Sequence, residues 1–110
     1  MTDEKILTNA QEDESSTLVK FSKAYRFEGK DYTEVDLSGM DDLSAEDMIA
    51  ADRYLTRSGS FSVMPEMTLE YACFIAARAA KQPIEFFRGL PPKDALKVKN
   101  RVTSFFYSEG

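Results

Sequence analysis

The chain has 110 residues, of which 43% are hydrophobic and 30% charged, and its net charge is −5. This length suits one domain, and the composition is normal for a globular protein in water. No apolar run approaches the roughly 20 residues of a membrane span, and an acidic chain without a basic patch is a poor nucleic-acid binder. Met1 to Lys5 lack the layout of a signal peptide. Cys73 is the single cysteine and has no partner for an internal disulfide, so we expect a reducing cytoplasm.

Residues 1–17 form an acidic N-terminal segment. They contain five acidic residues against the single base Lys5, and few large apolar groups. Segments of this composition cannot bury enough apolar surface to fold alone. We therefore predict a disordered acidic tail over 1–17 and a single domain over 18–110.

Residues 18–37 have the pattern of a β-hairpin. Apolar residues alternate with polar ones on both sides of Gly29, which supplies the backbone freedom of a tight bend. The apolar positions are Val19, Phe21, Tyr25 and Phe27 before the bend, and Thr33, Val35 and Leu37 after it. A three-residue bend would place Phe21 opposite Leu37, although the pattern leaves the turn type open.

The rest of the chain is predicted to be helical. Ser44 is typical of an N-cap for a helix that ends near Arg57, and Thr68 of an N-cap for an alanine-rich helix over 69–82. Residues 83–88 suit one short helical turn, and a last helix runs from Pro92 or Lys93 to about Tyr107, with Lys93, Lys97, Lys99 and Arg101 as an exposed basic sector. The fold class is α+β, mainly helical: an N-terminal β-hairpin followed by three to four helices.

The residues that usually carry catalysis are missing from this sequence. There is no histidine, the glycines are scattered rather than gathered in a phosphate loop, and Cys73 lies within an apolar helix pattern. The acidic residues Asp41, Asp42, Glu46 and Asp47 surround a helix start, where carboxylates cap the helix. We predict no catalytic residue, no metal site and no cofactor, and hence a non-enzymatic protein.

Two aromatic pairs are the best candidates for a partner-binding surface. A helix can turn only one of two adjacent residues fully inward, so Phe86-Phe87 and Phe105-Phe106 with Tyr107 should each leave an aromatic ring at the edge. The candidate contact residues are Phe86, Phe87, Phe106 and Tyr107. The alternative, that both rings of each pair belong to the core and its rim, stays open.

The order of these patterns resembles the tail assembly chaperones of long-tailed bacteriophages and prophages. The resemblance covers residues 18 to 107 and rests on patterns of hydrophobic residues and turns, which are as follows. They are the hairpin run Phe27-Glu28-Gly29-Lys30-Asp31-Tyr32-Thr33-Glu34-Val35-Asp36-Leu37, the connector Met40-Asp41-Asp42-Leu43-Ser44, the alanine-rich helix that stops at Pro83, and Gly89-Leu90-Pro91-Pro92-Lys93-Asp94 leading to Val102-Thr103-Ser104-Phe105-Phe106.

The resemblance implies a chaperone that coats the tape measure protein and recruits tail tube subunits in the host cytoplasm, without entering the mature virion. An open edge of the hairpin would add to the sheet of a neighbouring copy, so we also expect self-association along the client. A longer form made by ribosomal frameshifting near Phe105-Phe106 is a further hypothesis. The alternatives are a small cytoplasmic protein–protein adaptor unrelated to phage, a tail structural component that stays in the virion, and a small metal-dependent enzyme that uses the acidic cluster.

Overall fold

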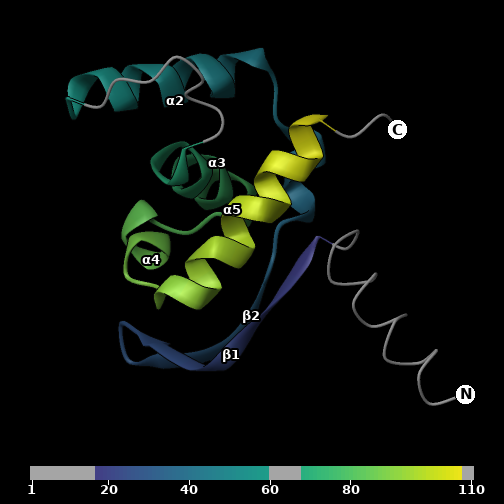
Figure 1. The fold of residues 1–110 in the computed structure, drawn as a ribbon, viewed down its shortest axis with the longest axis vertical. Helices are drawn as coiled ribbons and strands as arrows, with labels where there is room; N and C mark the ends of the chain where they lie inside the picture. The colour runs from purple at the N-terminus through teal and green to yellow at the C-terminus, as the bar shows by residue number, and fades with distance from the viewer. Residues whose placement is uncertain (1–16, 60–67, 108–110) are drawn as a thin grey trace, which may run out of the picture.

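The computed structural model describes residues 17–59 and 68–107. The predicted tail lies outside these residues except for Thr17. Residues 60–67 and 108–110 lie outside them as well. The elements are β1 (Leu18–Phe27), β2 (Lys30–Asp36), the 3-10 helix η1 (Ser38–Asp42), α2 (Ala45–Arg57), α3 (Leu69–Ala80), α4 (Ile84–Arg88) and α5 (Pro92–Tyr107). The predicted hairpin and helices are thus confirmed (Figure 1).

The hairpin turns through two residues, Glu28 and Gly29, which have φ angles of 52° and 83°. Two positive φ angles in a two-residue loop match the right-handed twist of the paired strands. The pairs nearest the turn are Phe27 with Lys30 and Tyr25 with Tyr32. The three-residue bend that placed Phe21 opposite Leu37 is therefore wrong.

A bulge in β1 also shifts the register of the hairpin. Lys20 pairs with Glu34 and Tyr25 with Tyr32, so residues 21–24 of β1 lie where β2 has only Thr33. The shift turns Tyr32 toward the core in place of the predicted Thr33, which is exposed. A bulge of this kind bends the strand and re-aims its backbone groups.

Helix α3 lies at the centre of the molecule and has neighbours on most sides. It contacts η1, α2, α4 and α5 (Figure 1), and seven of its residues are buried: Tyr71, Ala72, Cys73, Ile75, Ala76, Ala77 and Ala79. The small alanine side chains allow close approach, and a Cβ added at Gly39 of η1 would overlap the Ala79 carbonyl oxygen. The helix ends at Ala80 because Lys81 adopts a left-handed cap before Pro83.

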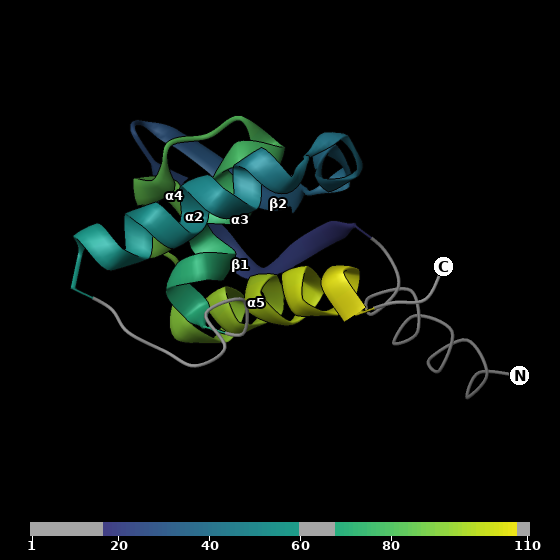
Figure 2. The ribbon, with the colours of Figure 1, turned by 90° about the horizontal axis from the view of Figure 1, so that it is seen from above.

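Helix α5 runs alongside β1, as the view from above shows (Figure 2). Its apolar face buries Ala95, Val98 and Val102. Arg101, predicted in the exposed basic sector, is instead only 9% exposed. Its guanidinium donates to the Leu18 carbonyl oxygen at 3.2 Å, because β1 crosses α5 on this side. None of the described helices combines the length and apolarity needed to cross a membrane.

Candidate functional site

Phe86 and Phe87 are both buried, at 0% and 1% exposure. The expectation that this pair leaves an exposed ring for a partner is therefore wrong. Phe86 is the centre of an aromatic cluster with the hairpin rings of Tyr25, Phe27 and Tyr32, whose centroids lie 5.2, 5.2 and 4.9 Å away in edge-to-face geometry. These residues hold the hairpin on the helices.

The position of α4 explains this burial. Aromatic rings of the hairpin cover the short helix on one side and α3 packs on another, and the residues of α4 that face solvent are Glu85 and Arg88 rather than either ring. The Tyr25 hydroxyl donates to the Phe86 carbonyl oxygen at 2.8 Å, and burial raises the pKa of that hydroxyl above 10.0. A Cβ at Gly89 would lie 2.7 Å from the Tyr25 oxygen, so this glycine permits the close contact.

The second predicted pair lies at an exposed end of the molecule. Phe106 is half-buried, with its ring centroid 5.9 Å from that of Tyr71, while Tyr107 is 53% exposed. Leu69, in the first turn of α3 two residues before Tyr71, is 39% exposed. We call Phe106 and Tyr107, together with Leu69 at the start of the helix on which Phe106 packs, the C-terminal patch. It brings together two of the four predicted contact residues.

A groove between α2 and α3 is a second candidate site, which the sequence reasoning missed. It is a hollow of about 290 Å³, lined by Ala50, Arg53, Tyr54, Arg57, Phe74 and Arg78, and we call it the arginine groove. The lining residues of α2 recur three and four positions apart, so they form one row on that helix. This spacing was visible in the sequence, but nothing local indicated that the row faces Phe74 and Arg78.

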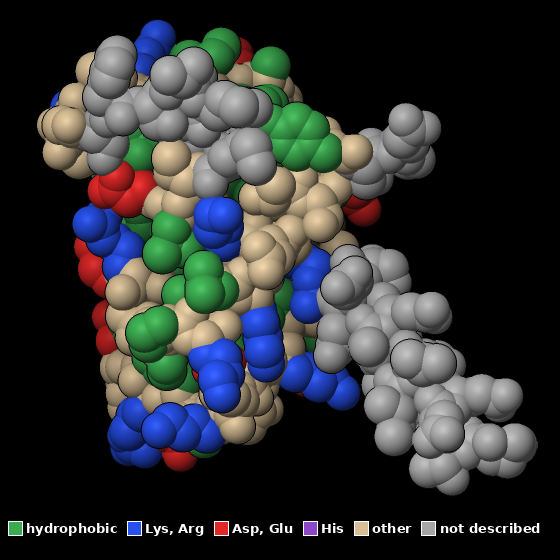
Figure 3. Space-filling model, in the orientation of Figure 1, with side chains coloured by type: hydrophobic (Ala, Val, Ile, Leu, Met, Phe, Trp, Pro, Cys, Tyr) green, Lys and Arg blue, Asp and Glu red, His purple; other side chains and the backbone are tan. Residues whose placement is uncertain are grey.

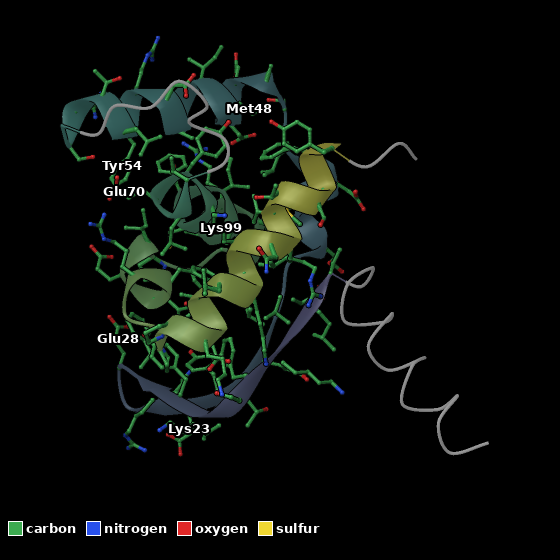
Figure 4. The ribbon with its side chains drawn as sticks, in the orientation of Figure 1. Lys23, Glu28, Met48, Tyr54, Glu70 and Lys99 are labelled. Atoms are coloured by element: carbon green, nitrogen blue, oxygen red, sulfur yellow. The ribbon has the colours of Figure 1, made fainter. Side chains whose placement is uncertain are left out.

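Aromatic and charged contacts organise this groove. The Tyr54 and Phe74 ring centroids are 5.3 Å apart, and the Arg78 guanidinium lies 5.1 Å from the Phe74 centroid while pairing with Asp47 at 2.8 Å. At one end of the groove, Arg88 of α4 donates to the Tyr54 hydroxyl and pairs with Glu70 at 3.7 Å. Figure 4 shows Tyr54 and Glu70 next to each other on this side of the molecule.

The outer edge of β1 is covered by polar side chains of α5. The buried carboxylate of Asp94 accepts from the Ser22 backbone N–H at 2.9 Å and from its hydroxyl at 3.1 Å, and Lys97 donates to the Lys20 carbonyl oxygen at 2.9 Å. Together with Arg101, these side chains take the place of a third strand. Lysines and arginines also gather on the solvent side of α5 and on the hairpin (Figure 3).

Asp47 caps a helix and Cys73 is buried. Ser44 and Asp47 form a reciprocal capping box at the start of α2. Burial raises the pKa of the Cys73 thiol to about 11, although the nearby Arg88 charge opposes this and Glu70 adds to it. Within residues 17–59 and 68–107, no three histidine, cysteine or acidic side chains are grouped in a way that could hold a metal ion.

Comparisons of the chain with protein-family models, with curated protein sequences and with solved structures found no match.

Proposed function

We propose that this protein is a phage tail assembly chaperone: a non-enzymatic protein that binds the tape measure protein and recruits tail tube subunits. The resemblance of residues 18–107 to that family is the starting point. The exposed C-terminal patch is the observation that carries the proposal, because it offers apolar and aromatic surface at one end of a well-packed body.

The apolar composition of the patch suits the apolar face of an amphipathic helix in a long client. Tyr107 and Leu69 supply exposed apolar surface, and Phe106, fixed against Tyr71, supplies a rigid ring between α5 and α3. A helix that docks its apolar face on such anchors is a common mode of protein recognition. Phe86 and Phe87 act indirectly in this proposal, because they hold the hairpin in place.

Co-expression with the tape measure and tail tube proteins encoded by the same phage or prophage tests this function. We expect both to co-purify with the tagged wild-type chain, and the double variant Leu69→Ser with Tyr107→Ser to lose at least about tenfold of the client, equivalent to 1.4 kcal/mol. Leu96→Ser is the matched control, since Leu96 is 51% exposed on α5 but lies outside the patch. Both variants must keep the wild-type circular dichroism spectrum.

Three results would count against the proposal. Unchanged client binding by the folded double variant would remove the patch from the mechanism. Failure of the wild type to bind either tail protein would favour the adaptor alternative. Detection of the chain in purified virions by mass spectrometry would make it a tail structural component.

A further inference from the structure

The arginine groove has two arginines in its wall, Arg53 and Arg57, that are not held in ion pairs within the described part of the chain. Both are exposed, and they lie one helical turn apart on α2. Arg78, by contrast, is paired with Asp47. Asp52, the acidic residue next to Arg53, does not line this groove; it lines the adjoining hollow on α2, which Arg53 and Arg57 also line.

The complementary charge lies in the same chain. Residues 1–16, which the structure does not describe, contain Asp3 and Glu4 before the apolar pair Ile6-Leu7, and a second acidic run over 12–14 after it. With Lys5 as their only base, these residues have a net charge of −4, which leaves −1 for residues 17–110. The acidity of the protein is therefore concentrated in one short segment.

We propose that the acidic N-terminal segment, residues 1–16, of one copy docks in the arginine groove of a second copy. Its carboxylates pair with Arg53 and Arg57 through charge-assisted hydrogen bonds, and Ile6-Leu7 packs against the rings of Tyr54 and Phe74. The groove thus binds both features of the segment, its negative charge and its apolar pair Ile6-Leu7.

The position of the segment's attachment favours docking between copies over docking within one. β1 begins at Leu18, which Arg101 holds against α5, while the C-terminal half of α2, with Arg53 and Arg57, lies at the opposite side of the molecule (Figures 1 and 2). A segment bound within its own copy would have to cross the whole body. A segment from a neighbouring copy meets no such restriction.

The two surfaces of this contact are different, so the association is head-to-tail. A dimer formed in this way keeps one unoccupied groove and one undocked segment, which belong to different copies. Contacts of this kind extend into open chains unless their rotation closes a ring. β1 offers no competing edge over residues 18–22, because Arg101, Lys97 and Asp94 occupy its outer backbone groups. The contact needs no client protein, so its test is independent of the function proposed above.

Three full-length variants test this contact. The groove variant carries Arg53→Glu and Arg57→Glu. The segment variant carries Asp3→Asn, Glu4→Gln, Glu12→Gln, Asp13→Asn and Glu14→Gln. The matched control carries Lys30→Glu and Lys93→Glu, which change the net charge as much as the groove variant does, at exposed lysines outside the groove. The substituted residues within the described part of the chain are all exposed, and circular dichroism checks that each variant folds.

Sedimentation velocity over a range of protein concentrations measures the association. We expect the wild type and the matched control to form oligomers at about 0.02 M salt and to dissociate near 1 M, where the Debye length is only about 3 Å. The groove and segment variants should each stay monomeric. Their equimolar mixture should form a dimer that does not grow, because only one intact segment and one intact groove can meet.

The mixture is the decisive sample. A mixture that stays monomeric, or a groove variant that associates like the wild type, would overturn the proposal. A wild type that remains monomeric at low salt and every concentration would overturn it as well.

Discussion

Asp94 is fully buried, and its carboxylate is stabilised there by hydrogen bonds. It accepts from both the backbone N–H and the hydroxyl of Ser22, and Lys97 lies 3.7 Å away. A buried charge is tolerated only when it is paired and hydrogen-bonded, so these three partners belong together. Asp94 also lies in the first turn of α5, where a negative charge suits the helix dipole.

Replacement of Asp94 should show how much these hydrogen bonds contribute to the free energy of unfolding. We expect Asp94→Ala to lower the free energy of unfolding by about 2–4 kcal/mol, because it leaves the Ser22 N–H without its acceptor. Ser22→Ala removes only the hydroxyl bond and should cost about 1 kcal/mol. Urea unfolding measures both, and an Asp94→Ala variant as stable as the wild type would show that water replaces the carboxylate.

The Cys73 thiol makes the free energy of unfolding depend on pH in the alkaline range. Burial raises the pKa of its thiol from 9.0 to about 11, so between these values the folded state retains a proton that the unfolded state has lost. The contribution of the protonated thiol is complete below pH 9 and falls as pH rises through this window. The sign follows because the native state binds more protons there.

The variant Cys73→Ala isolates this effect from the titrating tyrosines and lysines. We expect the wild type to lose about 2 kcal/mol more stability than the variant between pH 9 and pH 11. Chemical unfolding at several pH values measures the difference. Parallel pH profiles for the two proteins would contradict the raised pKa.

At the scale of elements, close backbone approach decides how η1 fits the helical body. Gly39 lies directly against the Ala79 carbonyl of α3, whereas Gly29 in the hairpin turn has open space where a Cβ would be. The two glycines are therefore needed for different reasons. Gly39 is needed for packing, and Gly29 for its positive φ of 83°.

These reasons predict different costs for the same substitution. Gly39→Ala forces two backbones apart and should lower stability by about 2–4 kcal/mol, or more than 8 °C in Tm for a domain of roughly this size. Gly29→Ala only strains the turn and should cost about 1 kcal/mol. Thermal unfolding followed by circular dichroism compares them, and equal costs would contradict the packing role of Gly39.

At the scale of the whole molecule, one hydrophobic core joins the hairpin to the helices. Val19 and Phe21 of β1 belong to the same buried cluster as Ile75 of α3 and Phe86 of α4. A two-stranded hairpin is only marginally stable in water, so this one depends on the aromatic cluster and on the polar contacts with α5. Hairpin and helices should therefore unfold together.

Native-state hydrogen exchange tests this cooperativity. We expect the backbone amides of Val19 and Tyr32 to exchange with opening free energies within about 1 kcal/mol of that of Ile75, as in a single cooperative unit. Phe86→Ala should lower all three by about 3–5 kcal/mol. Hairpin amides that open several kcal/mol more easily than Ile75 would identify the hairpin as an independent, labile unit.

The sequence by itself determined the kinds of element and most of their ends. Period-two alternation, the caps Ser44 and Thr68, and the stops at Pro83 and Gly89 are local signals, because each depends on residues a few positions apart. The burial of Cys73 also followed from the apolar surroundings of its helix.

Only the tertiary structure decided which faces were exposed. The burial of Phe86 depends on the hairpin aromatics about 60 positions earlier in the chain, and that of Arg101 on Leu18. The bulged segment of β1 likewise bonds to Asp94 of α5 through Ser22, and the arginine groove exists because of the way α2 faces α3. These features arise from contacts between distant segments, and no pattern within a short stretch of sequence specifies which segments will meet.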